Sequence, residues 1–199
     1  MLADLAEKAE ASVLKQRQIL KQQSLREAEG YLELLHLNGA IIHPSLSVRE
    51  FLAHQALAAL NRIDDFGSWS GYSYFLRGQA FRAMDRFQDA LEPLKKAAEL
   101  EREHVSTWLS LGWCYKRCGR IDLAIESLEE GLAVAPQHAI LYYNLACYWS
   151  LARHVQHAVA YLSRAFDLDP HYRDMVPQET DFDPIRQHPH FQAVNTVVV

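Results

Sequence analysis

WLSLGWCY, residues 108–115, carries the pattern that decides the fold. Its key residues stand at positions i, i+3, i+4 and i+7, and they are Trp108, Leu111, Gly112 and Tyr115. That spacing places the four residues on one face of a helix. The absence of a side chain at Gly112 lets a partner helix come close. We therefore predict a helix here that packs against a second helix.

The pattern recurs every 34 residues. After the WLSLGWCY stretch come Ala124, Leu128 and Pro136. One period later stand Tyr142, Leu145, Ala146, Trp149, Ala158, Leu162 and Pro170, and one period earlier stand Tyr74, Gly78, Phe81, Ala90 and Leu94. Another step back finds only Ala56 and Leu60, since Pro44 falls where the glycine should be. The alanines and leucines indicate a second helix in each unit, which the prolines end.

This pattern resembles the tetratricopeptide repeat, a helix–turn–helix unit of 34 residues. The resemblance covers residues 71–172 well and residues 48–70 by half. It implies an all-α protein whose helix pairs stack into a right-handed superhelical solenoid. The implied division is 1–47 for N-terminal helices that cap the array, 48–70 for a degenerate repeat, 71–104, 105–138 and 139–172 for three repeats, and 173–199 for a C-terminal capping segment.

Apolar spacing and turn residues place the helices. We predict them near 2–22, 25–37, 48–62, 72–84, 87–101, 105–118, 121–134, 139–152 and 155–168. The stretch Ser47–Glu50 reads as a capping box that opens the helix at 48–62. Pro93 falls inside a predicted helix, where it removes one backbone hydrogen bond.

The sequence after Pro170 is expected to cover the last repeat, which would otherwise present apolar surface to water. The apolar residues available for this are Phe182, Ile185, Phe191 and Val194. Asp181 and Asp183 are expected to cap short helical turns.

Composition narrows the function. Hydrophobic residues make up 49% and charged residues 23% of the 199 residues, as in ordinary soluble proteins. A net charge of −5 argues against bulk electrostatic binding to nucleic acid or to an anionic membrane. The first residues lack signal-peptide features, and three cysteines fit reduced thiols. We therefore expect a cytoplasmic protein that binds neither nucleic acid nor membrane.

A second stripe on the same helices indicates where a partner binds. Leu109, Trp113 and Lys116 lie one residue out of phase with the first stripe. In the repeat family, such positions of the first helices usually line the concave groove. The resemblance therefore implies a partner-binding groove lined by Tyr72, Phe75, Gln79, Arg82, Leu109, Trp113, Lys116, Arg117, Ile140, Tyr143 and Cys147. A groove with apolar residues and basic residues at one rim suits an amphipathic helix or extended peptide with acidic charge.

The competing interpretation is that these side chains pack internally, or that the N-terminal helices fill the groove. Metal sites receive less support. Cys114, Cys118 and Cys147 are better explained as small apolar filler, and the pairs His154/His157 and His188/His190 as surface histidines. We identify no nucleophile–base set. We therefore expect no enzyme, no cofactor and no metal.

The sequence thus predicts an adaptor or scaffold that binds a peptide or helix of a partner protein. The identity of that partner and the oligomeric state stay open. One alternative is a secretion-type chaperone, some of which place helices ahead of three such repeats. Another is a self-assembling structural protein, in which the N-terminal helices of one copy occupy the groove of another.

Overall fold

The computed structural model describes residues 2–37, 44–63 and 70–196, and the regular elements in those ranges are all helical. Side chains are described for residues 7–35, 44–63 and 70–195. The chain divides into two compact units, Met1–Glu101 and Arg102–Val199. Each unit has its own buried apolar residues.

The first unit contains α1 (Leu2–Leu37), α2 (Leu46–Asn61), α3 (Gly71–Ala83) and α4 (Phe87–Leu100). The prediction of two helices in 2–22 and 25–37 is wrong, since α1 is continuous. No proline or glycine lies between the two predicted segments to interrupt it. The predicted capping box at Ser47–Glu50 is also wrong. Ser45, rather than Ser47, caps α2, and its side chain accepts from the Val48 amide.

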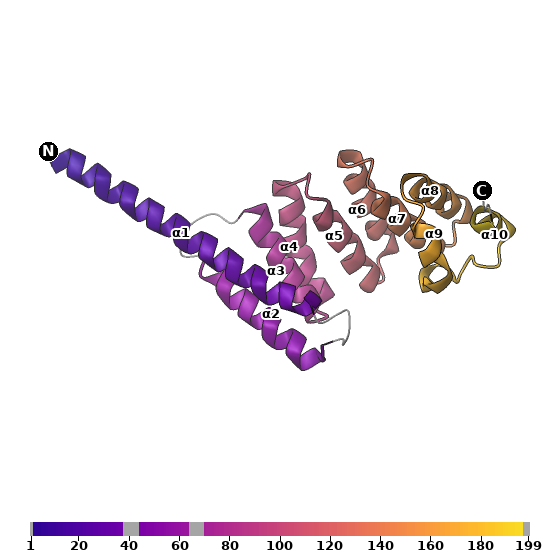
Figure 1. Ribbon diagram of the computed structural model, residues 1–199, viewed down its shortest axis with the longest axis horizontal. Coiled ribbons are helices and arrows are strands. Elements are labelled where there is room, and N and C mark those ends of the chain that lie inside the picture. The colour runs from indigo at the N-terminus through magenta and orange to yellow at the C-terminus, as the bar shows by residue number, and fades with distance from the viewer. Residues whose placement is uncertain (1, 38–43, 64–69, 197–199) are drawn as a thin grey trace. The chain divides into compact units, whose positions relative to one another are not determined.

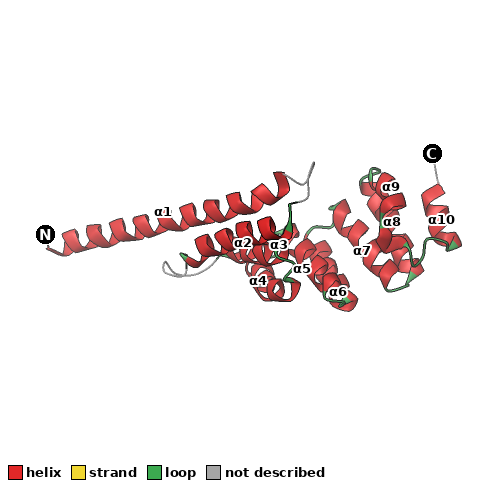
Figure 2. Cartoon of the chain, turned by 90° about the horizontal axis from the view of Figure 1, so that it is seen from below, coloured by secondary structure: helices red, strands yellow, loops and turns green. Residues whose placement is uncertain are grey.

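The C-terminal half of α1 packs against α2 as the first helix of a repeat would. Figures 1 and 2 show α1 beside α2, with its N-terminal half continuing past the other helices of this unit. Ala28 and Leu32 of α1 are buried in one cluster with Ala56 and Leu60 of α2. The partial repeat pattern of Ala56 and Leu60 in α2 therefore has a helix to pack against, although α1 carries no matching glycine motif.

The second unit contains α5 (Val105–Arg117), α6 (Ile121–Val134), α7 (Ala139–Leu151) and α8 (Val155–Leu168). Four short elements follow, and they are α9 (Tyr172–Met175), the 3₁₀ turns η2 (Val176–Gln178) and η3 (Thr180–Phe182), and α10 (Pro189–Thr196). The predicted bounds of α3 to α8 are confirmed to within one residue. Pro93 lies inside α4, as predicted.

Close packing within each helix pair follows the small residues. A Cβ atom added to Gly78 would lie 2.5 Å from Cγ of Leu94, and one added to Gly112 would lie 3.1 Å from Cγ of Leu128. The prediction that these glycines bring the two helices of a pair together is confirmed.

The turn between the paired helices also repeats. Its central residue has a left-handed backbone at Asp85 (φ 58°), Gly119 (φ 75°) and Arg153 (φ 62°), which are 34 residues apart. In each turn the next amide donates to the carbonyl five positions earlier, at 2.9–3.0 Å. The 34-residue period therefore holds for the backbone as well as for the core side chains.

Candidate functional site

The predicted groove residues lie on the first helices of the repeats, α3, α5 and α7, and they differ in exposure. Two side chains are exposed, Arg117 and Ile140. Two are buried, Tyr143 and Cys147. The others are half-buried, and they are Tyr72, Phe75, Gln79, Arg82, Leu109, Trp113 and Lys116.

In the first unit, α1 covers part of the predicted face of α3. The Tyr72 hydroxyl donates a hydrogen bond to the Glu29 carboxylate of α1. The Tyr72 ring stacks on Phe75 at 6.1 Å between centroids, and both rings pack against the cluster that contains Ala28 and Leu32. Burial, followed by the bond to Glu29, raises the pKa of Tyr72. For Tyr72 and Phe75, the structure therefore agrees with the competing interpretation, in which an N-terminal helix lies against the predicted groove face.

In the second unit, the segment after α8 covers the predicted face of α7. The Tyr143 ring lies 4.8 Å from that of Tyr172 and 5.8 Å, edge to face, from that of Phe182. Tyr143 and Cys147 are 4% and 2% exposed. Their place differs from the expectation, because the chain's own C-terminal segment lies on them. Burial also raises the pKa of each group above its ordinary value.

Asp181 connects this segment to the first helices. Its carboxylate pairs with the Lys116 ammonium of α5, and its carbonyl accepts from the Ser150 hydroxyl at 2.7 Å. The expected capping role of Asp181 is wrong, since Glu179 accepts from the Asp181 amide instead. The Asp183 carboxylate forms an ion pair with the Arg186 guanidinium, at 2.8 Å between the nearest oxygen and nitrogen. The α5 and α7 faces thus hold an acidic residue followed by an aromatic one, Asp181–Phe182.

Trp113 and Arg117 form the other notable feature of α5. The Arg117 guanidinium lies 5.3 Å from the centroid of the Trp113 ring, within cation–π range. Leu109 stands one turn before Trp113 on the same stripe. An apolar surface beside a cation can bind an apolar side chain with a neighbouring carboxylate.

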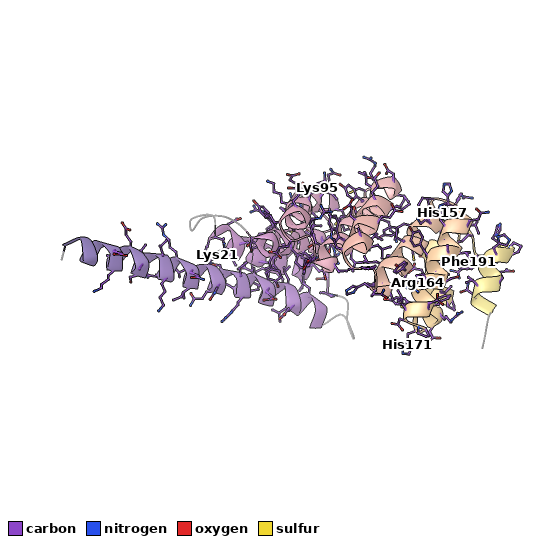
Figure 3. All side chains as sticks on the ribbon, turned by 90° about the horizontal axis from the view of Figure 1, so that it is seen from above. Lys21, Lys95, His157, Arg164, His171 and Phe191 are labelled. Atoms are coloured by element: carbon purple, nitrogen blue, oxygen red, sulfur yellow. The ribbon has the colours of Figure 1, made fainter. Side chains whose placement is uncertain are left out.

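The described parts of the chain contain no group of three or more histidine, cysteine, aspartate or glutamate residues placed to hold a metal ion. Cys114 and Cys147 are buried thiols, and His157, labelled in Figure 3, stacks on Trp149 at 4.5 Å. Among the helices described, none has the length and apolar character needed to cross a bilayer.

Comparison with known proteins agrees with this architecture. A model of the tetratricopeptide repeat family matches residues 81–146. The crystal structure of YrrB, described as a TPR protein with an unusual peptide-binding site, superposes with a TM-score of 0.58 at 18% identity. The superposition covers 84% of this chain and 87% of YrrB, and at that identity it shows a shared fold.

Two fungal proteins are similar over part of the sequence. Protein bimA of Emericella nidulans is 24% identical over 87 residues, which cover 44% of this chain and 11% of bimA. The anaphase-promoting complex subunit cut9 of Schizosaccharomyces pombe is 26% identical over 100 residues, which cover 50% of this chain and 15% of cut9. The chain therefore spans only a small part of these curated relatives.

Proposed function

Since this chain is a tetratricopeptide repeat protein, we propose that it is a non-enzymatic scaffold that binds a segment of a partner protein. The binding surface would be the first helices of its repeats. One observation carries the proposal, namely the seating of Asp181–Phe182 on α5 and α7 in the second unit. This contact supports a surface whose chemistry suits a short acidic and aromatic stretch of chain.

The contact combines two kinds of interaction. The Lys116 and Asp181 side chains are only 24% and 13% exposed, so their ion pair is shielded from water. Charge-assisted hydrogen bonds of this kind are stronger than neutral ones. Phe182 is fully buried beside Tyr143. A partner segment with an apolar anchor next to a carboxylate has the matching chemistry.

We place the partner on the part of the predicted site that keeps exposure in the second unit. Trp113 and Leu109 are half-buried on α5, and Arg117 and Ile140 are exposed. Trp and Arg are the residue types that most often dominate binding energy at interfaces. Trp113 would supply the apolar contact, and Arg117 would favour acidic residues.

The test compares Trp113→Ala with Glu126→Ala, a control at an exposed position of the second helix α6. Affinity capture from the native host with the wild-type chain identifies the partner, and titration calorimetry measures its affinity. We expect Trp113→Ala to weaken binding about tenfold or more, and Glu126→Ala to leave it unchanged. Circular dichroism should show equal helicity in all three proteins.

A second variant, Arg117→Glu, tests the same surface in case Trp113→Ala impairs folding, because Arg117 is exposed. It should weaken the same complex by reversing one charge. Full binding by both Trp113→Ala and Arg117→Glu would refute the proposed surface. A secretion-type chaperone would use the same surface, and it would differ in keeping its partner soluble upon co-expression.

We further propose that the protein works in the cytoplasm without a cofactor or metal. The buried thiols of Cys114 and Cys147 support a reducing compartment.

A further inference from the structure

The N-terminal half of α1 is exposed along its length. Every described side chain from Glu7 to Leu20 is exposed. Four of them are large and apolar, and they are Val13 (49% exposed), Leu14 (64%), Ile19 (46%) and Leu20 (38%). In Figure 3, side chains of α1 before the labelled Lys21 project from both edges of the helix, and in all three views no other helix of the first unit lies beside this half of α1.

This exposure is unfavourable for a lone helix. Isolated helices of about 15 residues are marginally stable in water, and most helices in proteins are stabilised by packing an apolar face. Large apolar side chains in water also forgo the free energy that their burial would provide. A partner that covers Val13, Leu14 and Leu20 would stabilise this half of α1.

The exposed face continues the buried one. Val13 and Leu20 are seven positions apart and share a face, and Leu20 leads in one further turn to Ser24. Ser24 and Ala28 are buried, and the C-terminal half of α1 packs on α2. Glu10 and Arg17 stand on either side of Val13 along the same face. The uncovered face therefore carries one acidic and one basic residue around an apolar centre.

Charge is divided along this half of α1. The acidic residues of this half, Asp4, Glu7 and Glu10, all come before Val13, together with one basic residue, Lys8. From residue 11 to residue 26 every charged residue is basic, and these are Lys15, Arg17, Lys21 and Arg26. Two such helices in antiparallel orientation, centred near Val13, place Glu10 opposite Arg17 and Glu7 opposite Lys21. A parallel pair would instead set like charges against each other.

We propose that residues 7–23 of α1 form a self-association surface, on which a second copy of the chain packs antiparallel. Such a contact is isologous, since the same surface of both copies is used and one twofold axis relates them. Val13 and Leu14 lie near the axis, and the charged pairs set the orientation. The α2 helix does not obstruct the contact, because α1 becomes buried only from Ser24 onward.

The charge pattern favours a second copy over a membrane surface. Helices that lie on anionic membranes carry basic residues beside an apolar face. Here the carboxylate of Glu10 stands on the apolar face itself, and Glu7 lies one turn before it. A self-complementary arrangement accounts for both signs of charge.

The experiment measures the mass of the full chain by sedimentation equilibrium over about a hundredfold range of concentration. We expect a reversible monomer–dimer equilibrium in the wild-type chain. Glu7→Lys with Glu10→Lys, and separately Arg17→Glu with Lys21→Glu, should each weaken the dimer about tenfold or more, since like charges then face each other. An equal mixture of the two variants should form a heterodimer.

A matched control carries Glu99→Lys and Glu103→Lys, which change the charge equally at exposed positions outside the α1 sequence. Its dimerisation should equal that of the wild type. A chain with all four α1 changes should pair with itself and avoid the wild type, because both ends of the helix are reversed.

A wild-type chain that stays monomeric at every concentration would overturn the proposal. So would dimers that ignore the α1 charge changes, or a four-change chain that prefers the wild type, which would indicate parallel pairing. The partner-binding proposal concerns α5 and α7, so its test is decided independently of this result.

Discussion

At the scale of single residues, glycines in similar helices have opposite packing environments. A Cβ atom added to Gly78 would lie 2.5 Å from Leu94 Cγ, whereas one added to Gly30 in α1 would meet nothing within 4 Å. The repeat pattern identified Gly78 as a close-contact position. Gly30 belongs to no motif, and only its surroundings show that a larger side chain fits there.

We therefore expect Gly78→Ala and Gly30→Ala to have opposite effects on stability. Overpacking against Leu94 should outweigh the gain in helix propensity and lower the free energy of unfolding by about 1–2 kcal/mol. Gly30→Ala should raise the free energy of unfolding by up to about 1 kcal/mol. Urea denaturation followed by circular dichroism checks both, and a stabilised Gly78→Ala chain would contradict the packing argument.

The left-handed turn residues give a second contrast. Gly119 adopts φ 75° without steric cost, while Arg153 holds φ 62° with a full side chain. Gly119→Ala should lower the free energy of unfolding by about 1–2 kcal/mol, and Arg153→Gly should leave it unchanged or raise it. Thermal unfolding of both variants checks this, and an unaffected Gly119→Ala chain would contradict it. Since Asp, Gly and Arg fill the same turn position, the residue types alone did not reveal it.

At the scale of elements, Arg186 fixes the segment that covers α7. Its guanidinium donates to the carbonyls of Val176 and Glu179 at 3.2 and 2.6 Å, and it pairs with the Asp183 carboxylate. The helices were predictable because their apolar spacing is local. The place of this segment was not, since it depends on contacts such as Lys116 with Asp181, which are far apart in the sequence.

Arg186→Ala should therefore loosen the segment and expose Cys147. Loss of hydrogen bonds to a charged group is worth about 1.5–3 kcal/mol, so the open fraction should rise about tenfold or more. The reaction rate of Cys147 with a thiol reagent, in a Cys118→Ser background, measures the effect. Arg120→Ala, whose arginine pairs with Asp122 in another turn, is the control and should react at the wild-type rate.

At the scale of the whole molecule, burial couples stability to alkaline pH. It raises the pKa of Cys147, Tyr143 and Tyr72 above their ordinary values of 9.0 for the thiol and 10.0 for the phenols. As the pH rises past those values, the unfolded chain releases these protons first. The stabilising contribution is therefore complete below about pH 9 and decreases above it.

The free energy of unfolding should thus be similar at about pH 7.5 and 8.5 and clearly lower at about pH 10. Urea titrations at the three values, followed by circular dichroism, measure it. Cys147→Ala should flatten the first part of the decline. A stability that rises with pH over this range would contradict the assignment.

The whole molecule also has features that the sequence patterns did not predict. The 34-residue period predicted α3 to α8, since each repeat encodes its own core face. Local sequence patterns do not indicate which groove residues the chain itself covers. Tyr143 and Cys147 were therefore predicted as partner-binding residues. The net charge of −5 also conceals the division of acidic and basic residues along α1.

The segment from Tyr172 to α10 has a consequence for engineering longer arrays. The ring centroids of Phe182 and Phe191 lie 5.2 Å apart, and both side chains are buried in the second unit. A designed repeat joined directly after Leu168 would compete with them for the same apolar surface. Lengthening the protein in this direction requires transplanting residues 172–196 onto the newly added final helix pair.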